Sequence, residues 1–452
     1  MTQNIEFSAL MPCDSNFLYR WHTMPRAINR LTPPWENVKI LEQPDHLSNN
    51  QQVHIKLDGF IDWKLRILDL DEGKSFSDTQ ITGPFSSWTH QHSMQTINST
   101  SSLLVEKINF KLPILDSFLG EIFTESKLKP LFNYRFRVMF NDLKTHYMNK
   151  DTKAMKILIT GSSGLVGSAL YDFLSSGGHK VSRLVRNKTN LEHEIYWNPE
   201  ESEIDLEKLE GYDAVIHLAG ENIANKRWSK RQKAKIFKSR IDGTNFIAET
   251  LLKLKHPPST FICASAIGFY GDRKEEFCNE DSEAGEGFLA ETCIQWEKAS
   301  QLLKAKDIRV INTRFGIILD PRSGALGKML PLFKLGAGGR LGSGKQWMSW
   351  VALDDVLGII LHCITNKDIS GPVNVVSPNP TINNEFTKVL GKILKRPTIA
   401  PAPSIALKLM LGEMANALLL SSTKVEAKVL KNSGYEFAYP DLEAALRHML
   451  GK

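Results

Sequence analysis

Residues 156–167 read KILITGSSGLVG. The apolar run KILIT predicts a buried β-strand, and the glycine-rich turn after it predicts the start of a helix. Gly161, Gly164 and Gly167 form a GxxGxxG pattern, in which the first glycine allows the tight turn, the second lets backbone N–H groups approach a pyrophosphate, and the third permits close helix–strand packing. The partial positive charge of a helix N-terminus favours the same phosphates. We therefore predict a dinucleotide-binding loop, rather than a turn that binds nothing, made of Gly161, Ser162, Gly164, Leu165, Val166 and Gly167.

Further strands and helices alternate beyond this loop. KVSRLV at 180–185, DAVIHLA at 213–219 and TFICAS at 260–265 are apolar strand candidates, and helical segments lie between them. This alternation predicts a Rossmann-type, doubly wound parallel sheet with an α/β fold over about residues 155–400.

The end of the second strand indicates which dinucleotide the loop prefers. Folds that prefer NAD place an Asp or Glu about 20 residues after the glycines, where it binds the ribose 2′-hydroxyl. Here the chain reads VSRLVRNK and has no acid, while Arg186 follows the strand directly. An arginine fork suits a 2′-phosphate. We favour NADP(H) over NAD(H), although a basic loop of this kind is also common on solvated surfaces.

Residues 1–150 have a different character. Segments from 53 to 113 alternate polar and apolar residues, which predicts an antiparallel meander, with helices expected at 14–30 and 126–148. His22, His90 and His92 raise the possibility of a metal site. No acid or thiol is tied to them in sequence, so we prefer aromatic lining of a ligand cavity or core packing, and assign no metal.

Composition narrows the functional class. The 452 residues carry a formal charge of +6 and five cysteines in no metal-binding spacing, which predicts free thiols in a reducing compartment and gives no argument for nucleic-acid binding. No apolar run is long enough to span a membrane, and the N-terminus lacks a secretory signal pattern. We expect a cytoplasmic protein with a small-molecule substrate or apolar ligand.

Many segments in the right order give residues 156–452 a specific resemblance to the extended and atypical short-chain dehydrogenase/reductases, in their epimerase-family branch. The matching segments are KILITGSSGLVGSAL, YDAVIHLAGENIA, SRIDGT, SAIGFYGD, FLAETCIQWEKA, TRFGIILDPRSGAL, GSGKQWMSWVALDDV and GPVNVVSPNP. The resemblance implies that His217, Leu218, Ala219 and Gly220 line the adenosine side of the cofactor, and that Gly316 and Ile317 lie near the nicotinamide. It also implies a small C-terminal helical module over 401–452 and the possibility of a homodimer.

The N-terminal region resembles the START-like, polyketide-cyclase-like ligand-binding domains that are fused to this branch. The matching features are WHTMPRAINRLTPPWENV, FSDTQITGPFSSWTHQH and NYRF. The resemblance implies an α+β helix-grip domain over 1–150, in which a curved antiparallel sheet holds a long C-terminal helix around an apolar cavity.

The resemblance also exposes a missing catalytic pair. Reductases of this superfamily use Tyr-xxx-Lys on one helix face to move a proton as hydride moves. Aligning FLAETCIQWEKA by Glu297 places Leu289 and Cys293 at the two positions, and neither side chain can replace the pair. Tyr270 and Ser265, near the end of the strand 260–265, are the candidate catalytic residues, although Tyr270 is equally well read as packing its turn.

Two cations on a predicted helix complete the candidate site. Arg240, in SRIDGT, is expected to bind a cofactor phosphate or an anionic substrate, with help from Lys235, although a surface salt bridge is the alternative. Two functions follow. The first is an NADP(H)-dependent oxidoreductase or sugar-nucleotide-epimerase-like protein with non-standard proton transfer, and the second is a non-catalytic NADP(H)-sensing or ligand-binding protein.

Overall fold

The computed structural model describes residues 2–113 and 122–452, so residues 114–121 of the predicted N-terminal domain lie outside the described residues. The chain forms two compact units. The first comprises Met1–Ala154 with Asp172–His179 and His448–Lys452, and the second comprises Met155–Tyr171 with Lys180–Arg447. The units correspond broadly to the change in sequence character near residue 150.

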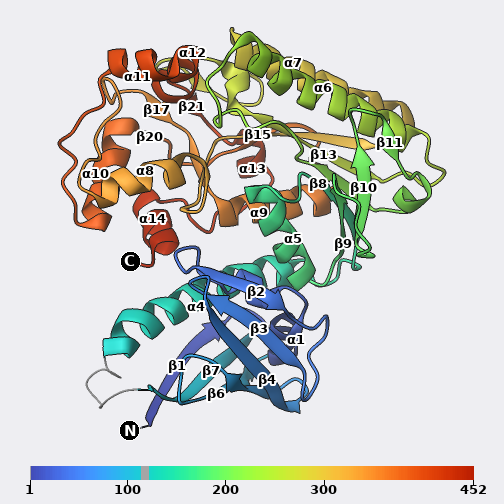
Figure 1. Ribbon diagram of the computed structural model, residues 1–452. Helices are drawn as coiled ribbons and strands as arrows, with labels where there is room; N and C mark the ends of the chain where they lie inside the picture. Colours follow the sequence, from blue (N-terminus) through green and yellow to red (C-terminus); the bar gives the residue numbers. More distant parts are fainter. Residues whose placement is uncertain (1, 114–121) are drawn as a thin grey trace. The chain divides into compact units, whose positions relative to one another are not determined.

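The first unit is mostly a seven-stranded antiparallel sheet in the order β1-β7-β6-β5-β4-β3-β2 (Figure 1). Its strands are β1 (Gln3–Met11), β2 (Val38–Glu42), β3 (Gln52–Leu57), β4 (Ile61–Asp71), β5 (Ser75–Thr82), β6 (Ser87–Asn98) and β7 (Ser101–Lys111). The predicted meander from residue 53 to 113 is confirmed as β3 to β7. The sequence analysis missed β1 and β2, which occupy the two edges of the sheet.

The helices of this unit pack on one face of the sheet. They are α1 (Ser15–Thr23), α2 (Ala27–Arg30) and α4 (Lys129–Met148), the last preceded by a π-helical turn, Thr124–Leu128. The helix expected at 14–30 is broken because Arg26 adopts a left-handed conformation with φ of 70°. Along α4, Phe132 packs with the strand residues Ile108 and Phe110, and Met139 packs with Leu104. The long helix therefore covers the core of the antiparallel sheet.

The second unit contains an eight-stranded sheet in the order β11-β10-β9-β8-β12-β13-β15-β19. Its strands are β8 (Lys156–Thr160), β9 (Lys180–Val185), β10 (Glu194–Asn198), β11 (Glu203–Ile204), β12 (Ala214–His217), β13 (Thr260–Ala266), β15 (Arg309–Phe315) and β19 (Gly371–Val375). All neighbouring pairs are parallel except β10 and β11. The predicted Rossmann-type sheet is confirmed, and β10, β11, β15 and β19 are strands that were not predicted individually from the sequence.

Helices cover both faces of this sheet. Figure 1 shows α6 and α7 on one face, with α5 and α9 on the other. The helices are α5 (Leu165–Ser176), α6 (Lys230–Leu252), α7 (Phe288–Ser300), α8 (Gly324–Lys334), α9 (Leu353–Thr365), α10 (Asn383–Leu394), α11 (Ser404–Leu411), α12 (Glu413–Ala415), α13 (Lys428–Asn432) and α14 (Leu442–Leu450). The short strands are β14 (Phe277–Cys278), β16 (Ile317–Leu319), β17 (Trp347–Met348), β18 (Trp350–Ala352), β20 (Thr381–Ile382) and β21 (Lys424–Val425).

A buried carboxylate joins α9 to the C-terminal segment. Asp355, in the first turn of α9, accepts hydrogen bonds from the backbone N–H groups of Ala438 at 2.7 Å and Tyr439 at 3.0 Å. Burial raises the pKa of Asp355 to about 7, although the two backbone donors oppose that shift. This carboxyl group is therefore a source of pH-dependent stability.

The five cysteines, Cys13, Cys263, Cys278, Cys293 and Cys363, are all buried and free, as the sequence predicts for the thiols. Burial raises the pKa of each thiol, to about 12 for Cys13 and about 11 for Cys293. Across residues 2–113 and 122–452, no helix combines the length and the hydropathy that crossing a bilayer requires.

Candidate functional site

The order in which successive strands are added to the parallel sheet reverses at β8. The chain runs outward from β8 through β9 and β10 on one side, and through β12, β13 and β15 on the other. In such sheets ligands bind in the crevice outside the carboxyl ends of the strands, where the strand order reverses. The glycine-rich loop directly follows β8, so it lies at this switch point.

The three glycines of the loop have distinct structural roles. Gly161 has φ of +67°, and a Cβ there would lie 2.7 Å from the carbonyl carbon of Leu218. A Cβ on Gly167 would lie 2.3 Å from the Gly161 carbonyl oxygen, so the start of α5 packs tightly against the turn. A Cβ on Gly164 would meet only the Gly161 oxygen, at 3.2 Å. Gly161 and Gly167 are thus required by packing, whereas exposed Gly164 leaves space above the loop.

The remaining loop residues complete a cradle of backbone donors. Ser162 is buried, and the half-buried Leu165 and Val166 begin α5. The first turn of an α-helix leaves its N–H groups without intrahelical acceptors, and these groups carry the positive end of the helix dipole. The loop can therefore bind an anionic group such as a pyrophosphate.

Thr160 ties this loop to the next strand. Its hydroxyl bonds with Nδ1 of His217 at 2.8 Å and accepts hydrogen bonds from the backbone N–H groups of Leu218 at 3.1 Å and Ala219 at 3.2 Å. His217 is fully buried, and burial lowers its pKa to about 3, so the ring is neutral. Leu218, Ala219 and exposed Gly220 follow at the crevice, whereas His217 fastens β12 to β8. The sequence analysis did not identify Thr160, although its position at a strand end before the glycines was a usable signal.

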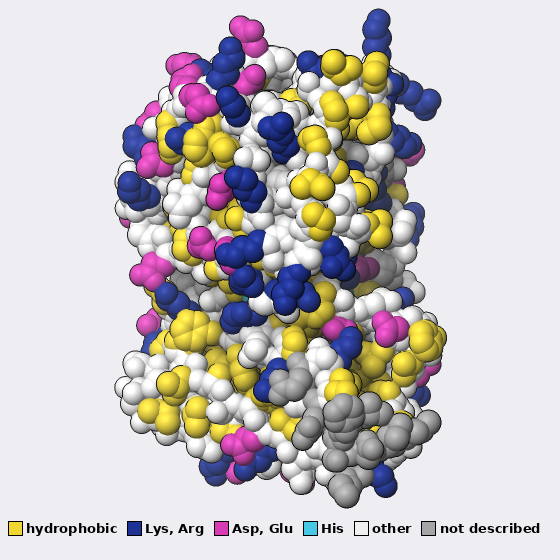
Figure 2. Space-filling model, turned by 90° about the vertical axis from the view of Figure 1, so that its left-hand side faces the viewer, with side chains coloured by type: hydrophobic (Ala, Val, Ile, Leu, Met, Phe, Trp, Pro, Cys, Tyr) yellow, Lys and Arg dark blue, Asp and Glu magenta, His cyan; other side chains and the backbone are white. Residues whose placement is uncertain are grey.

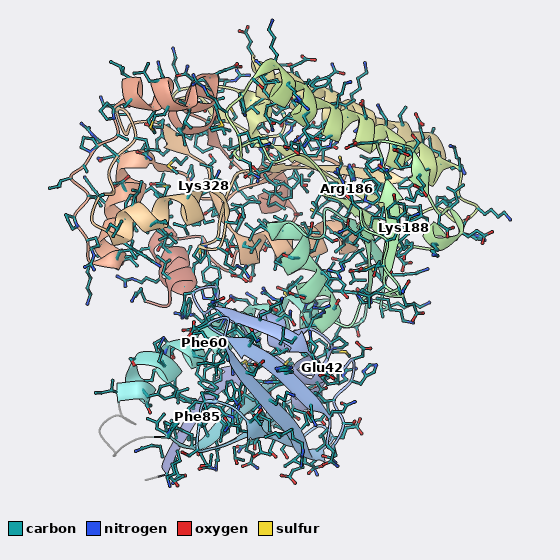
Figure 3. All side chains as sticks on the ribbon, in the orientation of Figure 1. Glu42, Phe60, Phe85, Arg186, Lys188 and Lys328 are labelled. Atoms are coloured by element: carbon teal, nitrogen blue, oxygen red, sulfur yellow. The ribbon has the colours of Figure 1, made fainter. Side chains whose placement is uncertain are left out.

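The basic residues after β9 fall into two groups. Arg183 forms an ion pair with Glu194 and stacks over the Tyr171 ring at 4.5 Å, so its guanidinium is already engaged by protein groups. Arg186 is exposed and forms no ion pair with any residue in the described ranges. Figure 3 shows Arg186 and Lys188 near each other at the end of this strand. Arg186 therefore offers a free guanidinium one residue after Val185, the last residue of β9.

Arg240 and Lys235 lie together on α6 but make different contacts. Arg240 donates from Nη1 to the carbonyl oxygens of Glu221 at 2.9 Å and Ile236 at 3.2 Å, and its guanidinium lies beside Gly220. Lys235 is largely exposed and pairs with the Glu221 carboxylate at 3.2 Å. Both cations therefore border the segment that follows β12.

Gly316 and Ile317 follow β15 at the same edge of the sheet. A Cβ on Gly316 would lie 2.5 Å from the Ser349 carbonyl oxygen, and the Ile317 N–H donates to that oxygen at 2.8 Å. Both residues are half-buried. The backbone at Ser349, between β17 and β18, thus approaches this turn closely, which accounts for a glycine at 316.

The two candidate catalytic residues belong to one buried polar chain. Ser265 donates to Glu297 at 2.7 Å, and Glu297 accepts two hydrogen bonds from Arg314, at 2.8 and 2.9 Å. Arg314 also donates to the Tyr270 hydroxyl at 2.9 Å, which in turn donates to Asn374 at 2.7 Å. The sequence analysis missed the Glu297–Arg314 pair because the two residues are 17 positions apart.

This placement changes the interpretation of Tyr270. Its side chain has no exposed area, and its hydroxyl is occupied by two protein groups. Burial raises its pKa to about 12, although the nearby Arg314 opposes the shift. A phenol so enclosed is poorly placed to give a proton to a substrate, so the geometry favours a positioning role for Tyr270.

The positions that correspond to Tyr-xxx-Lys carry no replacement acid. Leu289 and Cys293 both lie on α7, and Leu289 packs beside Gly268. Cys293 is 4% exposed, and burial raises its pKa to about 11, so the thiol stays protonated. The residues expected to bind the cofactor therefore lie along the crevice, whereas α7 does not carry the usual Tyr-xxx-Lys pair for proton transfer.

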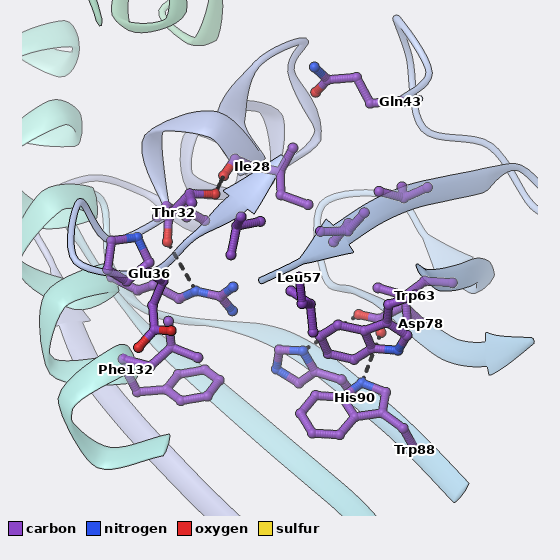
Figure 4. Close-up of a pocket in the computed structure, with 18 of the residues that line it drawn as sticks. Ile28, Thr32, Glu36, Gln43, Leu57, Trp63, Asp78, Trp88, His90 and Phe132 are labelled. Carbon is purple, nitrogen blue, oxygen red and sulfur yellow. Dashed lines mark hydrogen bonds and ion pairs between the residues drawn. The ribbon is translucent and has the colours of Figure 1, made fainter. Parts of the chain in front are cut away.

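A second candidate site lies inside the first unit. A cavity of about 430 Å³ lies between the antiparallel sheet and α4, and Figure 4 shows part of its lining. Apolar and aromatic side chains such as Leu57, Trp63, Trp88 and Phe132 form much of the wall. This volume and lining suit a small apolar ligand.

Comparisons with known proteins agree with this architecture. The family model described as "NAD dependent epimerase/dehydratase family" matches residues 157–376, and a domain of unknown function, DUF1731, matches residues 402–449. An epimerase family protein of Mycobacterium bovis, Mb2239, is 39% identical over 290 residues, which are 64% of this chain and 96% of the relative.

Two solved structures extend the likeness. The nucleoside-diphosphate sugar epimerase from Corynebacterium glutamicum is 32% identical with a TM-score of 0.82, covering 99% of this chain and 90% of that one. The human epimerase family protein SDR39U1, solved with NADPH, is 31% identical with a TM-score of 0.62, covering 65% of this chain and 99% of that one. The Corynebacterium likeness thus includes the N-terminal unit.

Proposed function

Because this chain belongs to the NAD-dependent epimerase/dehydratase family, we propose that it binds NADP(H) and acts as an oxidoreductase- or epimerase-like protein on a small molecule. The observation that carries the proposal is the open space at Gly164 beside a strand end that presents Arg186 and no acid. The human relative solved with NADPH supports the same cofactor.

Each part of the cofactor has a group of residues to hold it. Backbone donors of Gly161, Ser162, Gly164, Leu165, Val166 and Gly167 would hold the pyrophosphate, and Arg186 the 2′-phosphate. Leu218, Ala219 and Gly220 would line the adenosine side, while Gly316 and Ile317 would lie near the nicotinamide. Arg240 and Lys235 border the segment after β12 and would add positive potential there. The bound cofactor would supply hydride transfer.

The substrate's proton would have to come from a group other than a Tyr-xxx-Lys pair. Leu289 and Cys293 hold those positions, and Tyr270 and Ser265 are engaged by Arg314 and Glu297. This observation favours a second candidate function, a non-catalytic NADP(H)-sensing protein. Deuteride transfer from 4-deuterated NADPH to a panel of carbonyl compounds separates the two functions, because only the first transfers the label.

We also infer that the N-terminal unit is a helix-grip ligand-binding module of START-like, polyketide-cyclase-like type. The antiparallel sheet, the α4 helix across it and the apolar cavity between them support this reading. The division into 1–150, 155–400 and 401–452 follows from the same proposal, with an apolar small molecule as the ligand of the first domain.

A homodimer is a further part of the proposal. Figure 2 shows hydrophobic side chains gathered on the upper part of the face it presents. In and beside α8 and α11, large apolar side chains are exposed: Leu332, Leu335, Ile399, Ile405, Leu409 and Met410. Apolar patches of this kind mark interaction surfaces. Light scattering of the wild type and Leu409→Glu tests the dimer, and a cytoplasmic location stays a prediction from the sequence.

The cofactor is tested first by titrating the purified chain with NADPH and NADH, following tryptophan fluorescence and thermal unfolding. A ligand that binds only the folded state raises its stability. Gly164→Val should abolish binding and keep the fold, because its added atoms fill the space above the loop. Gly243→Ala is the matched control, since no atom lies within 4 Å of its added Cβ. Unchanged affinity in Gly164→Val would refute the phosphate cradle.

A further inference from the structure

One end of the N-terminal cavity is polar. Figure 4 shows Asp78 and His90 grouped with Trp63 and Trp88 at this end. His92 also lines the cavity and is buried, as is Glu106 on the neighbouring strand. Strand register brings these groups to one face of the sheet, because Asp78 pairs with His90 across β5 and β6 and His92 pairs with Glu106 across β6 and β7.

Three donor atoms, from His22, His92 and Glu106, converge on this end of the cavity, and His90 lies beside them. Glu106 Oε2 lies 2.7 Å from His92 Nδ1 and 2.9 Å from His90 Nε2. A ring nitrogen of His22, on α1, lies within 4.8 Å of the donor atoms of His92 and Glu106. Each of the four side chains is at least nine-tenths buried.

One of these side chains has an unpaired donor atom. His22 Nδ1 is buried without a hydrogen-bond partner among the described residues, whereas Glu106 Oε2 forms ion pairs with His92 Nδ1 and His90 Nε2. Leaving His22 Nδ1 in that state would cost about 1–3 kcal/mol. A cation placed among His22, His92 and Glu106 would give all three side chains a partner, since imidazole nitrogens and carboxylate oxygens are its natural ligands.

Asp78 orients the rings from behind. Its Oδ2 lies 3.3 Å from His92 Nε2 and 3.5 Å from His90 Nδ1, and its Oδ1 accepts a hydrogen bond from Trp88 at 3.2 Å. A carboxylate that takes the outer ring N–H leaves the inner nitrogen with a free lone pair, which is the usual arrangement behind metal-binding histidines. In the metal-free chain His92 Nδ1 is in ion-pair contact with Glu106, and a bound cation would take up the lone pair of this nitrogen in place of its proton.

We propose that His22, His92 and Glu106 bind one divalent transition-metal ion of the Zn²⁺ class. Two imidazoles and one carboxylate suit Zn²⁺ and its first-row neighbours better than Mg²⁺ or Ca²⁺. Donor atoms around tetrahedral Zn²⁺ are roughly 3.3 Å apart, given bonds of about 2.0–2.1 Å. The Glu106 Oε2–His92 Nδ1 distance of 2.7 Å is about half an ångström shorter than that spacing, and the His22 nitrogen lies within 4.8 Å of both atoms.

Arg135 makes the proposal more specific. This residue lines the same cavity from α4, and its positive charge interacts with Glu106 and Asp78. A fixed cation near the site weakens binding of a metal cation, so Arg135→Met should tighten it. If these side chains instead formed only an ion-pair network without a metal, Arg135→Met would remove a positive partner of Glu106 and Asp78 and would not affect metal uptake.

The test uses the full-length chain, first as purified by elemental analysis and then stripped with a chelator and titrated with Co²⁺ in the visible range. We expect one Co²⁺ per chain, with tetrahedral absorption bands that Zn²⁺ abolishes, and a rise in thermal stability with Zn²⁺. His92→Gln and Glu106→Gln should lose the bands. Asp78→Asn keeps all three ligands and should weaken binding roughly 10- to 100-fold.

His54→Gln is the matched control, because His54 pairs with Asp62 at 2.8 Å and does not line the cavity. It should bind Co²⁺ as the wild type does, and circular dichroism with a thermal unfolding transition like that of the wild type verifies that each variant is folded. If His92→Gln fails to fold, the comparison of wild type with Asp78→Asn decides. The proposal is overturned if the wild type takes up no Co²⁺, or if neither His92→Gln nor Asp78→Asn binds it more weakly.

Discussion

Arg186→Ala should convert an NADPH-selective site into one that no longer distinguishes the two cofactors. The side chain is exposed and has no ion-pair partner in residues 2–113 and 122–452, so its loss should change the free energy of unfolding by less than about 0.5 kcal/mol. A charge-assisted, two-pronged bond to a 2′-phosphate contributes about 1.5–3 kcal/mol. At 1.4 kcal/mol per tenfold, the Kd for NADPH should rise roughly 10- to 150-fold.

NADH lacks the 2′-phosphate, so its Kd should change by no more than about threefold. Isothermal titration of wild type and variant with both cofactors, at two salt concentrations, measures this. Added salt should weaken NADPH binding less in the variant, because one exposed charge contact has gone.

Arg183→Ala is the control for this measurement. The Arg183 guanidinium is held by Glu194 and the Tyr171 ring, so its loss should lower stability and affect both cofactors alike. An equal loss of NADPH and NADH affinity in Arg186→Ala would refute the assignment of Arg186 to the 2′-phosphate. So would an NADPH-selective loss in Arg183→Ala.

Three further predictions concern the frame of the site. Tyr270→Phe should destabilise the fold by about 1–3 kcal/mol in urea unfolding, because it strands Arg314 and Asn374; a stable variant that loses deuteride transfer would instead restore Tyr270 as the acid. Gly161→Ala should destabilise by at least about 1–2 kcal/mol, owing to φ of +67° and the Leu218 carbonyl, and equal stability would contradict the tight-turn reading. Because the folded-state pKa of Asp355, about 7, exceeds its unfolded value, stability should fall as pH rises from about 4 to about 7, by up to about 4 kcal/mol. Asp355→Asn should flatten that part of the urea-unfolding profile, and an unchanged slope would exclude Asp355 as its source.

The sequence predicted the elements whose signals are local. The glycine loop, its flanking strand and helix, and the strands β9, β12 and β13 follow from short-range pattern, because backbone geometry there depends on a few neighbouring residues. β1, by contrast, was missed although Ile5 and Phe7 alternate with Glu6 and Ser8, and it forms an edge strand apart from the meander. Its place was fixed by pairing with β7, about 100 residues later.

The side-chain clusters were harder to predict because they depend on contacts between elements. Glu297 and Arg314 lie on α7 and β15, and nothing local connects them. Glu106 was hidden for a different reason, because an irregularity between Thr96 and Asn98 shifts the register of β6 against β7 by one residue. Counting outward from the turn would have placed Ser93, and not His92, opposite Glu106.

Because all five thiols are buried, their reaction with a thiol reagent reports the local unfolding of the protein. A thiol reagent can modify a cysteine only after the surrounding segment opens, so labelling rates report local unfolding. Cys13 belongs to the antiparallel unit and the other four to the parallel-sheet unit. Mass spectrometry of samples labelled for increasing times would therefore measure the opening rate of each unit separately, with no engineered probe. It would also show in which unit a bound nucleotide or metal ion slows opening.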